Sequence, residues 1–247
     1  MEKNLNTPGG QMASRPLHFF WVVDCSGSMA GDKIDALNHA IQECIQPMKD
    51  EADNNPNAQL FIRTLKFATG ASWVTPEAVR LEDFVWEDLS IDPYAVTDMG
   101  RAFEALAAQL EMPPMPARAL PPVIVILSDG MPTDDWKRPL DKLLKMPWGK
   151  KAVRVAIAIG KGADRSVLEA FTGNPETVFD AGKPETLVHL IKWASTIASV
   201  VSSPVSKAVE IGPEGEAQDT PQPAPETILP NNLTVPDLPD SDEDDVW

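Results

Sequence analysis

Three stretches of almost unbroken apolar residues, each as long as one β-strand, constrain the fold of this chain most. They read LHFFWVVD (residues 17–24), PVIVIL (122–127) and AVRVAIAI (152–159). Strands without polar alternation are typical of parallel sheets that are covered on both faces. The runs are also far shorter than the roughly 18 residues that a membrane span needs. The sequence therefore predicts a buried, mostly parallel sheet and no membrane insertion.

Segments with helical periodicity lie between these strands, so the predicted fold class is α/β. Pro47 lies inside the first helical pattern and predicts that this helix kinks or ends early. Further helices are expected near 135–146, at 164–172 and at 184–203, with a short strand at 177–181. The apolar positions of the first two helical patterns recur at steps of three and four, and they are Ile34, Leu37, Ile41, Ile45 and Met48, then Met99, Phe103, Leu106 and Leu110.

Two segments rich in β-formers are joined at Gly70 and predict a hairpin. They are AQLFIRTLKFAT (58–69) and ASWVTPEAVRL (71–81). A hairpin here adds an antiparallel strand at the edge of the sheet.

Charge is distributed unevenly along the chain. With 37 acidic and 21 basic residues the net charge is −16, which excludes the cationic face of a nucleic-acid binder or of a protein bound to an anionic membrane. Residues 208–247 hold eleven acids, seven prolines and no lysine or arginine, so they cannot bury a core. We predict a flexible N-terminus (1–14), one domain (15–207) and a disordered acidic tail (208–247).

The chain has only two cysteines, Cys25 and Cys44, too few for a disulfide scaffold or a four-thiolate zinc site. Its opening residues, MEKNLNTPGGQMASRP, contain no apolar signal segment. We therefore expect a cytoplasmic protein with reduced thiols.

Oxygen-bearing side chains follow the predicted strands where ligands bind in an α/β sheet, at the carboxyl ends. Asp24, Ser26 and Ser28 follow the first strand, Thr97 precedes a helix, and Asp129 follows the central strand. Residues two apart in an extended loop face the same way, so the first three can converge on one point. Five hard oxygen donors suit Mg²⁺, or else Mn²⁺ or Ca²⁺, and leave a coordination position open.

This set of residues resembles the metal-ion-dependent adhesion site of von Willebrand factor A domains. Asp24-x-Ser26-x-Ser28, Thr97 and Asp129 before Gly130 match that motif at all five positions, and the resemblance covers about residues 15–203. It implies a doubly wound, mostly parallel six-stranded sheet with one antiparallel edge strand and helices on both faces. It also implies that Ser26, Ser28 and Thr97 ligate the metal, that Asp24 and Asp129 act largely through water, and that an acidic side chain of a protein partner completes the shell.

The segments WVVDCSGSM and SDGMPTDD are most similar to bacterial tellurium-resistance proteins of the TerY type. In that group the domain often accompanies a protein kinase and a phosphatase. The resemblance thus implies a non-enzymatic adaptor in stress signalling. The alternatives are a Mg²⁺-dependent phosphohydrolase with Asp24 as nucleophile, and a metal that only staples the loops.

The residues beside the motif have simpler interpretations. Asp98 and Asp134 are expected to be solvated or to cap helices. Cys25 is expected to pack under the loop, because no neighbour in the sequence would lower its pKa.

Three interpretations of the tail remain open. It can be a solubilising extension. Thr234, with Asp237 three residues on, resembles a phosphothreonine motif bound by forkhead-associated domains, so Thr220, Thr227 and Thr234 are candidate phosphorylation sites. Alternatively, a carboxylate from Asp240 to Asp245 docks on the metal of its own or a neighbouring molecule.

Overall fold

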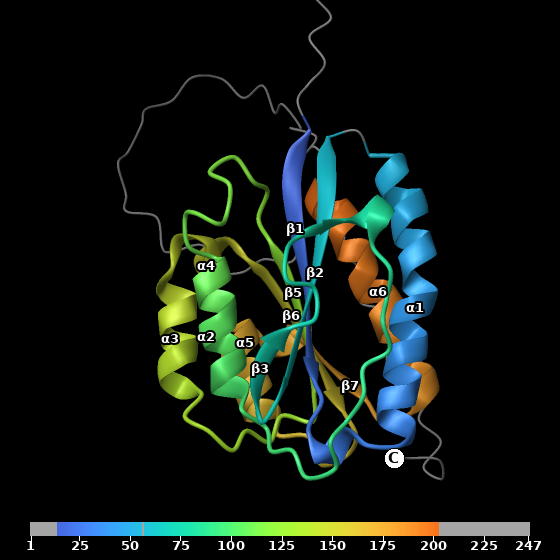
Figure 1. Cartoon of the computed structure of the whole chain (residues 1–247), viewed down its shortest axis with the longest axis vertical. Coiled ribbons are helices and arrows are strands. Elements are labelled where there is room, and N and C mark those ends of the chain that lie inside the picture. The colour runs from blue at the N-terminus through green and yellow to red at the C-terminus, as the bar shows by residue number, and fades with distance from the viewer. Residues whose placement is uncertain (1–13, 56, 203–247) are drawn as a thin grey trace, which may run out of the picture.

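The computed structural model describes residues 14–55 and 57–202, which fold as a sheet between two layers of helices (Figure 1). The predicted N-terminal segment lies outside this part except for Ser14, and so do the whole predicted tail and its three threonines. The strands are β1 (Arg15–Asp24), β2 (Ala58–Ala68), β3 (Gly70–Trp73), β4 (Val79–Arg80), β5 (Val123–Ser128), β6 (Val153–Ile159) and β7 (Val178–Ala181). The helices are α1 (Asp32–Asp53), α2 (Met99–Gln109), α3 (Lys137–Lys145), α4 (Pro147–Lys151), α5 (Arg165–Thr172) and α6 (Pro184–Ser202), with 3₁₀ turns η1 (Gly27–Met29), η2 (Leu81–Asp83) and η3 (Pro175–Thr177).

The sheet has the strand order β3-β2-β1-β5-β6-β7. All neighbours on this path are parallel except β3, which pairs antiparallel with β2 at the edge. The mostly parallel sheet with an antiparallel edge strand is thus confirmed. The predicted strand at 71–81 is split in two, because the two-residue β4 also pairs antiparallel with β2, so the sheet has seven strands where the resemblance implied six.

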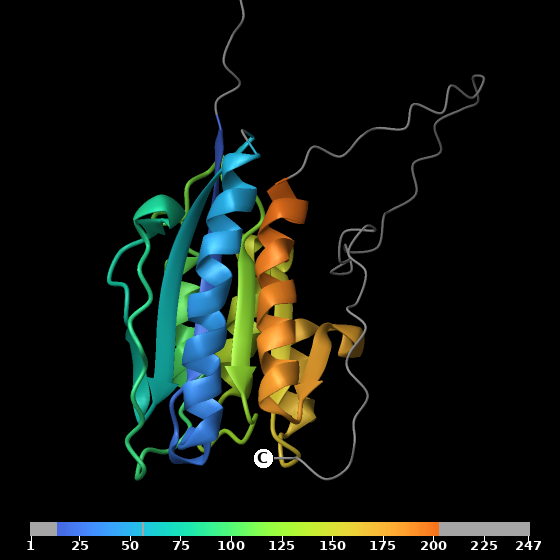
Figure 2. The same cartoon turned by 90° about the vertical axis from the view of Figure 1, so that its right-hand side faces the viewer.

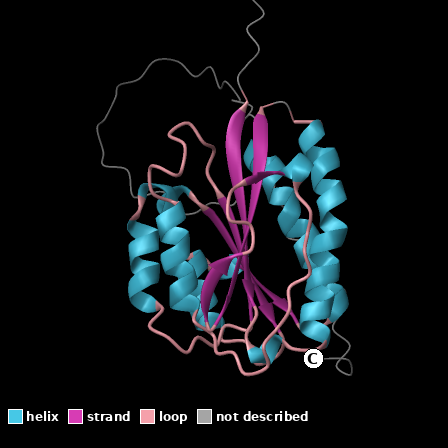
Figure 3. Cartoon of the chain, in the orientation of Figure 1, coloured by secondary structure: helices cyan, strands magenta, loops and turns pink. Residues whose placement is uncertain are grey.

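Alternate residues of β1 face two separate cores, which explains its unbroken apolar run. Trp21 and Val23 pack with α1 and α6 on one face, whereas Phe20 and Val22 pack with α2 and α5 on the other. Figure 2 shows α1 and α6 side by side on their face of the sheet, and Figure 3 shows helices on both faces. Because both faces are covered, both sets of alternating positions are mostly apolar.

The sequence predicted that the first helix kinks or ends early at Pro47, and the helix does not end there. α1 continues to Asp53 although proline removes one backbone hydrogen bond. Ile41, Cys44 and Met48 are buried against the core that α1 shares with α6. This burial on both sides of Pro47 offsets the lost bond, so the helix persists.

The second half of the predicted hairpin is shorter than expected. β3 ends at Trp73, and Pro76, which has no N–H to donate, separates it from β4. The Arg63 guanidinium donates to the carbonyl oxygens of Thr75 and Pro76 and lies 3.7 Å from the centre of the Trp73 ring. Side-chain contacts therefore replace the strand pairing over this stretch.

A buried histidine sits at the start of β1, far from the motif. His18 is stacked on Phe20 and Phe61, with ring centroids 6.1 and 5.4 Å away. Neither ring nitrogen has a hydrogen-bond partner among the described residues. Burial, reinforced by the positive charge of Arg63, lowers the pKa of His18 to about 4. The ring is therefore neutral at physiological pH.

Candidate metal centre

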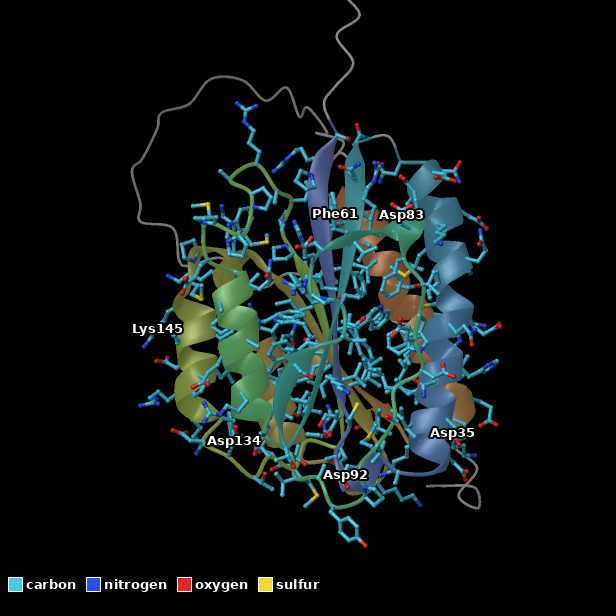
Figure 4. All side chains as sticks on the ribbon, viewed as in Figure 1. Asp35, Phe61, Asp83, Asp92, Asp134 and Lys145 are labelled. Atoms are coloured by element: carbon cyan, nitrogen blue, oxygen red, sulfur yellow. The ribbon has the colours of Figure 1, made fainter. Side chains whose placement is uncertain are left out.

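The carboxyl ends of the parallel strands gather the motif loops at one end of the molecule, the lower end in Figure 3. Figure 4 labels Asp92 and Asp134 at this end, whereas Phe61 and Asp83 lie toward the other. Val23 pairs with Leu127, so Asp24 and Ser128 take the next positions of adjacent strands. The topology thus places the first and third motif loops side by side.

Asp24 is the most buried member of the motif. It is 0% exposed, and its Oδ1 accepts a hydrogen bond from the Ser26 backbone N–H at 2.9 Å. Its Oδ2 accepts from the Ser128 hydroxyl at 2.5 Å. Burial raises the pKa of Asp24 to about 6, and the neighbouring charge of Asp129 adds to the rise, against the hydrogen bonds from Ser128 and Ser26. A bound cation would favour the charged form of this carboxyl.

Asp129 has a buried carboxylate oxygen that no described residue satisfies. The residue is 4% exposed, and its Oδ1 is buried without a hydrogen-bond partner among the described residues. Buried carboxylate oxygens are normally paired, because desolvation without a partner costs free energy. A cation near Asp129 and Asp24 would satisfy this oxygen.

The motif hydroxyls line the same loops. The Ser26 and Ser28 Oγ atoms are 3.0 Å apart, with Ser26 buried and Ser28 exposed. Thr97 is buried on the neighbouring loop, where its N–H donates to the Thr133 hydroxyl and its carbonyl accepts from the Thr133 N–H. The structure thus joins Asp24, Ser26 and Ser28 directly, and places Thr97 on an adjoining loop.

Two glycines allow the loops to pack this closely. A Cβ on Gly27 would lie 2.4 Å from the Pro93 carbonyl oxygen, and the Gly27 N–H donates to the Ala95 carbonyl. Gly130 has a φ of +68°, and a Cβ there would lie 2.5 Å from the Asp164 carbonyl oxygen. Any side chain at either position would push the motif loops apart.

The donor set fits a hard divalent cation. Two carboxylates and three hydroxyls supply oxygen ligands, and Cys25 Sγ is excluded because burial, reinforced by the charge of Asp24, raises its pKa to about 12. Within residues 14–55 and 57–202 no three His, Cys, Asp or Glu side chains form a metal cluster. The centre therefore depends on the hydroxyls as well as the two aspartates.

Sequence reasoning missed the role of Ser128. Its hydroxyl donates to Asp24 and accepts from the Gly130 N–H at 2.8 Å, so it fixes both carboxylate loops. A serine directly before the motif aspartate was the available signal, but the pairing register was needed to interpret it.

The two neighbouring aspartates left outside the motif bind backbone groups. Asp134 accepts from the N–H groups of Gly100 and Arg101, and so caps α2 from a distant loop. Asp98 accepts from the Gly70 N–H at 2.8 Å. Both therefore stabilise the loops around the metal centre.

Residues 20–193 match the family model of the von Willebrand factor type A domain, which covers more than half of the chain. The chain belongs to this family. Von Willebrand factor A domains commonly act as metal-dependent adhesion or interaction modules and bind a divalent metal at their metal-ion-dependent adhesion site (MIDAS). No curated protein sequence matches the chain.

Solved structures share the fold at low sequence identity. A von Willebrand factor type A protein from Catenulispora acidiphila is 16% identical with a TM-score of 0.55, over 75% of this chain and 43% of that one. The pilus adhesin SpaC from Lactobacillus rhamnosus GG is 12% identical with a TM-score of 0.61, over 77% and 31%. Proximal thread matrix protein 1 from the mussel byssus, in a form with a zinc-occupied MIDAS motif, is 15% identical with a TM-score of 0.54, over 75% and 48%. The chain spans less than half the length of these proteins.

No helix in the described part of this von Willebrand factor A chain is long and apolar enough to cross a membrane.

Proposed function

We propose that this chain is a metal-dependent protein-interaction module that binds Mg²⁺, or Mn²⁺ or Ca²⁺, at Asp24, Ser26, Ser28, Thr97 and Asp129. The observation that carries the proposal is the buried, unpaired Oδ1 of Asp129 close to the buried Asp24 carboxyl. Two buried acids without a cation between the loops would repel each other. A dication offsets both charges and gives the unpaired oxygen a partner.

The residues have distinct roles in this proposal. Ser26, Ser28 and Thr97 would ligate the metal through their hydroxyls, while Asp24 and Asp129 supply negative charge. Ser28 is exposed, so the metal would be approached from solvent on that side. Mg²⁺ takes about six oxygens, which leaves room for an acidic side chain of a protein partner.

The proposed activity is not enzymatic. In a phosphohydrolase Asp24 would need a free oxygen facing the substrate, but it is fully buried and both its oxygens already accept hydrogen bonds. Failure to trap a phospho-aspartate and absence of turnover on a generic phosphoester are the expected results.

We also propose a biological setting for this module. The similarity of WVVDCSGSM and SDGMPTDD to TerY-type proteins supports a role in bacterial stress response or tellurium resistance, in the cytoplasm, with a kinase and a phosphatase as partners. The acidic net charge supports protein partners over nucleic acid or anionic membranes.

Isothermal titration of Mg²⁺ and Mn²⁺ into the metal-stripped full chain tests the proposal. We expect binding in the wild type and its loss in Asp129→Asn, which removes the charge beside Asp24. The matched control is Asp141→Asn, whose side chain is 63% exposed on α3 and should bind as the wild type does. Equal binding by Asp129→Asn and the wild type would overturn the assignment. If the chain binds metal but captures the same partners from its native cell with and without chelator, the metal only holds the loops together.

A further inference from the structure

A groove of about 470 Å³ opens beside the candidate metal centre and shares a wall with it. Cys25, between the motif residues Asp24 and Ser26, lines the groove together with Lys66 of β2 and Asp92 of the loop before Thr97. Val23 pairs with Lys66 across β1 and β2, so the lysine lies one residue from the level of Asp24. Lys66 lies on the sheet face that Val23 and Cys25 share, so a ligand on the metal would pass Cys25 to reach the groove with its next residues.

Lys66 gives this groove a positive charge. It forms no ion pair within the part of the chain that the structure describes. Asp92 also lines the groove and contributes one negative charge, but its Oδ1 accepts from the Tyr94 N–H at 3.0 Å, which holds the carboxylate to its own loop. If a ligand places one carboxylate on the metal, a second carboxylate of the same ligand could form an ion pair with Lys66.

Apolar side chains project from the two loops around the metal centre. Tyr94 is 92% exposed, Val96 43% and Met131 58%. The loops that carry Val96 and Met131 are joined by the hydrogen bonds between Thr97 and Thr133. Among the five large apolar side chains exposed on the described residues, three thus border this one site, which is typical of a docking surface.

The chain itself contains a segment with matching chemistry. Residues 240–247 read DSDEDDVW, five acids followed by Val246 and Trp247. The acidic side chains are complementary in charge to the metal and Lys66. The apolar pair could pack against Tyr94, Val96 and Met131. We propose that residues 240–247 occupy the groove and the apolar border of their own molecule, with one carboxylate on the metal.

The length of chain outside the described residues permits this contact. α6 begins after β7 and runs back along the sheet, so it ends away from the motif loops (Figure 2). Its 19 residues make it about 28 Å long. Residues 203–239 could span roughly 120 Å if fully extended, several times the return distance. The contact is intramolecular, so the segment competes with an external acidic partner at a high effective concentration.

This inference rests on the proposed metal site, and Mn²⁺ titration of the full chain tests both. In one variant the five acids of the segment are neutralised, as Asp240→Asn, Asp242→Asn, Glu243→Gln, Asp244→Asn and Asp245→Asn. The matched control neutralises five other tail acids, as Glu210→Gln, Glu214→Gln, Glu216→Gln, Asp219→Asn and Glu226→Gln. Both variants change the net charge equally.

We expect the first variant to bind Mn²⁺ about tenfold more weakly than the wild type, and the control to stay within about twofold. Lys66→Gln should reproduce part of the loss and Lys66→Arg should restore it. Equal affinities in all tail variants, or equal losses in both, would overturn the inference and leave the metal site intact. Absence of Mn²⁺ binding in every variant would overturn the proposed function as well.

Tyr94 provides a second readout, because it is the single tyrosine of the chain. With ¹³C-labelled tyrosine, its ring signals should shift upfield on addition of Mg²⁺ as the indole of Trp247 approaches. Trp247→Leu should abolish this ring-current shift while Mg²⁺ still binds. The same response in Trp247→Leu and the wild type would refute docking at Tyr94.

Discussion

Asp24→Asn should stabilise the metal-free protein while it removes metal binding. The pKa of Asp24 rises from 3.8 to about 6 in the folded state, chiefly through burial. At about 1.36 kcal/mol per pKa unit, the ionised carboxylate costs the folded state about 3 kcal/mol. Asparagine avoids this cost and keeps the contacts, since its oxygen can accept from the Ser26 N–H and its amide can donate to the Ser128 hydroxyl.

Urea unfolding in excess chelator, near pH 7.5, measures the effect. The variant should gain up to about 3 kcal/mol in unfolding free energy, or roughly 6–12 °C in Tm. Because the pKa of this acid is raised by folding, the wild type regains stability as the pH falls, and the difference should close between about pH 6 and 4. At about 1,000-fold excess of metal over its Kd the order should reverse, because only the wild type gains about 4.1 kcal/mol from binding.

The exposed Asp141→Asn is the control for the chemical change and should alter stability by less than about 0.5 kcal/mol. If Asp24→Asn is no more stable than the wild type in chelator, Asp24 carries no uncompensated charge in the folded protein. The buried charge of Asp24 would then not account for a cation at this site.

Three further perturbations test other parts of the structure. Gly27→Ala should weaken metal binding in calorimetry and lower the unfolding free energy in urea by about 1–3 kcal/mol, because its Cβ would lie 2.4 Å from the Pro93 carbonyl oxygen. Wild-type behaviour of this variant would refute the close loop packing. Folding lowers the pKa of His18 to about 4. The unfolding free energy of the wild type relative to His18→Phe should therefore fall by about 3 kcal/mol as the pH drops from about 7 to 4. A difference that does not change with pH would contradict the burial of a neutral ring. Phe103→Ala removes a fully buried ring that stacks on Phe171, with the ring centroids 5.6 Å apart. The variant should lose about 3–5 kcal/mol of unfolding free energy in urea and still bind metal. A loss below about 1 kcal/mol would show that this core is loosely packed.

The sequence by itself determined the class of fold and the end of the sheet that carries the candidate site. A parallel sheet covered on both faces favours apolar residues on both faces of its strands, so the runs around Trp21, Ile124 and Val155 could be recognised locally. Parallel strands also end at a common edge, so the order of elements alone predicts that Asp24 and Asp129 lie near each other. Local signals were weaker where long-range packing competes with them, as at Pro47, where burial against α6 keeps the helix intact.

The tertiary structure alone decided the contacts that depend on register and on loops meeting in space. The pairing of β1 with β5 places the Ser128 hydroxyl where it donates a hydrogen bond to Asp24, and a loop distant in sequence brings Asp134 to the N-terminus of α2. The unpaired oxygen of Asp129 and the groove at Lys66 likewise arise between segments far apart in the chain. Periodicity specifies which face of an element is buried, but it carries no information on which residue of a distant element lies opposite.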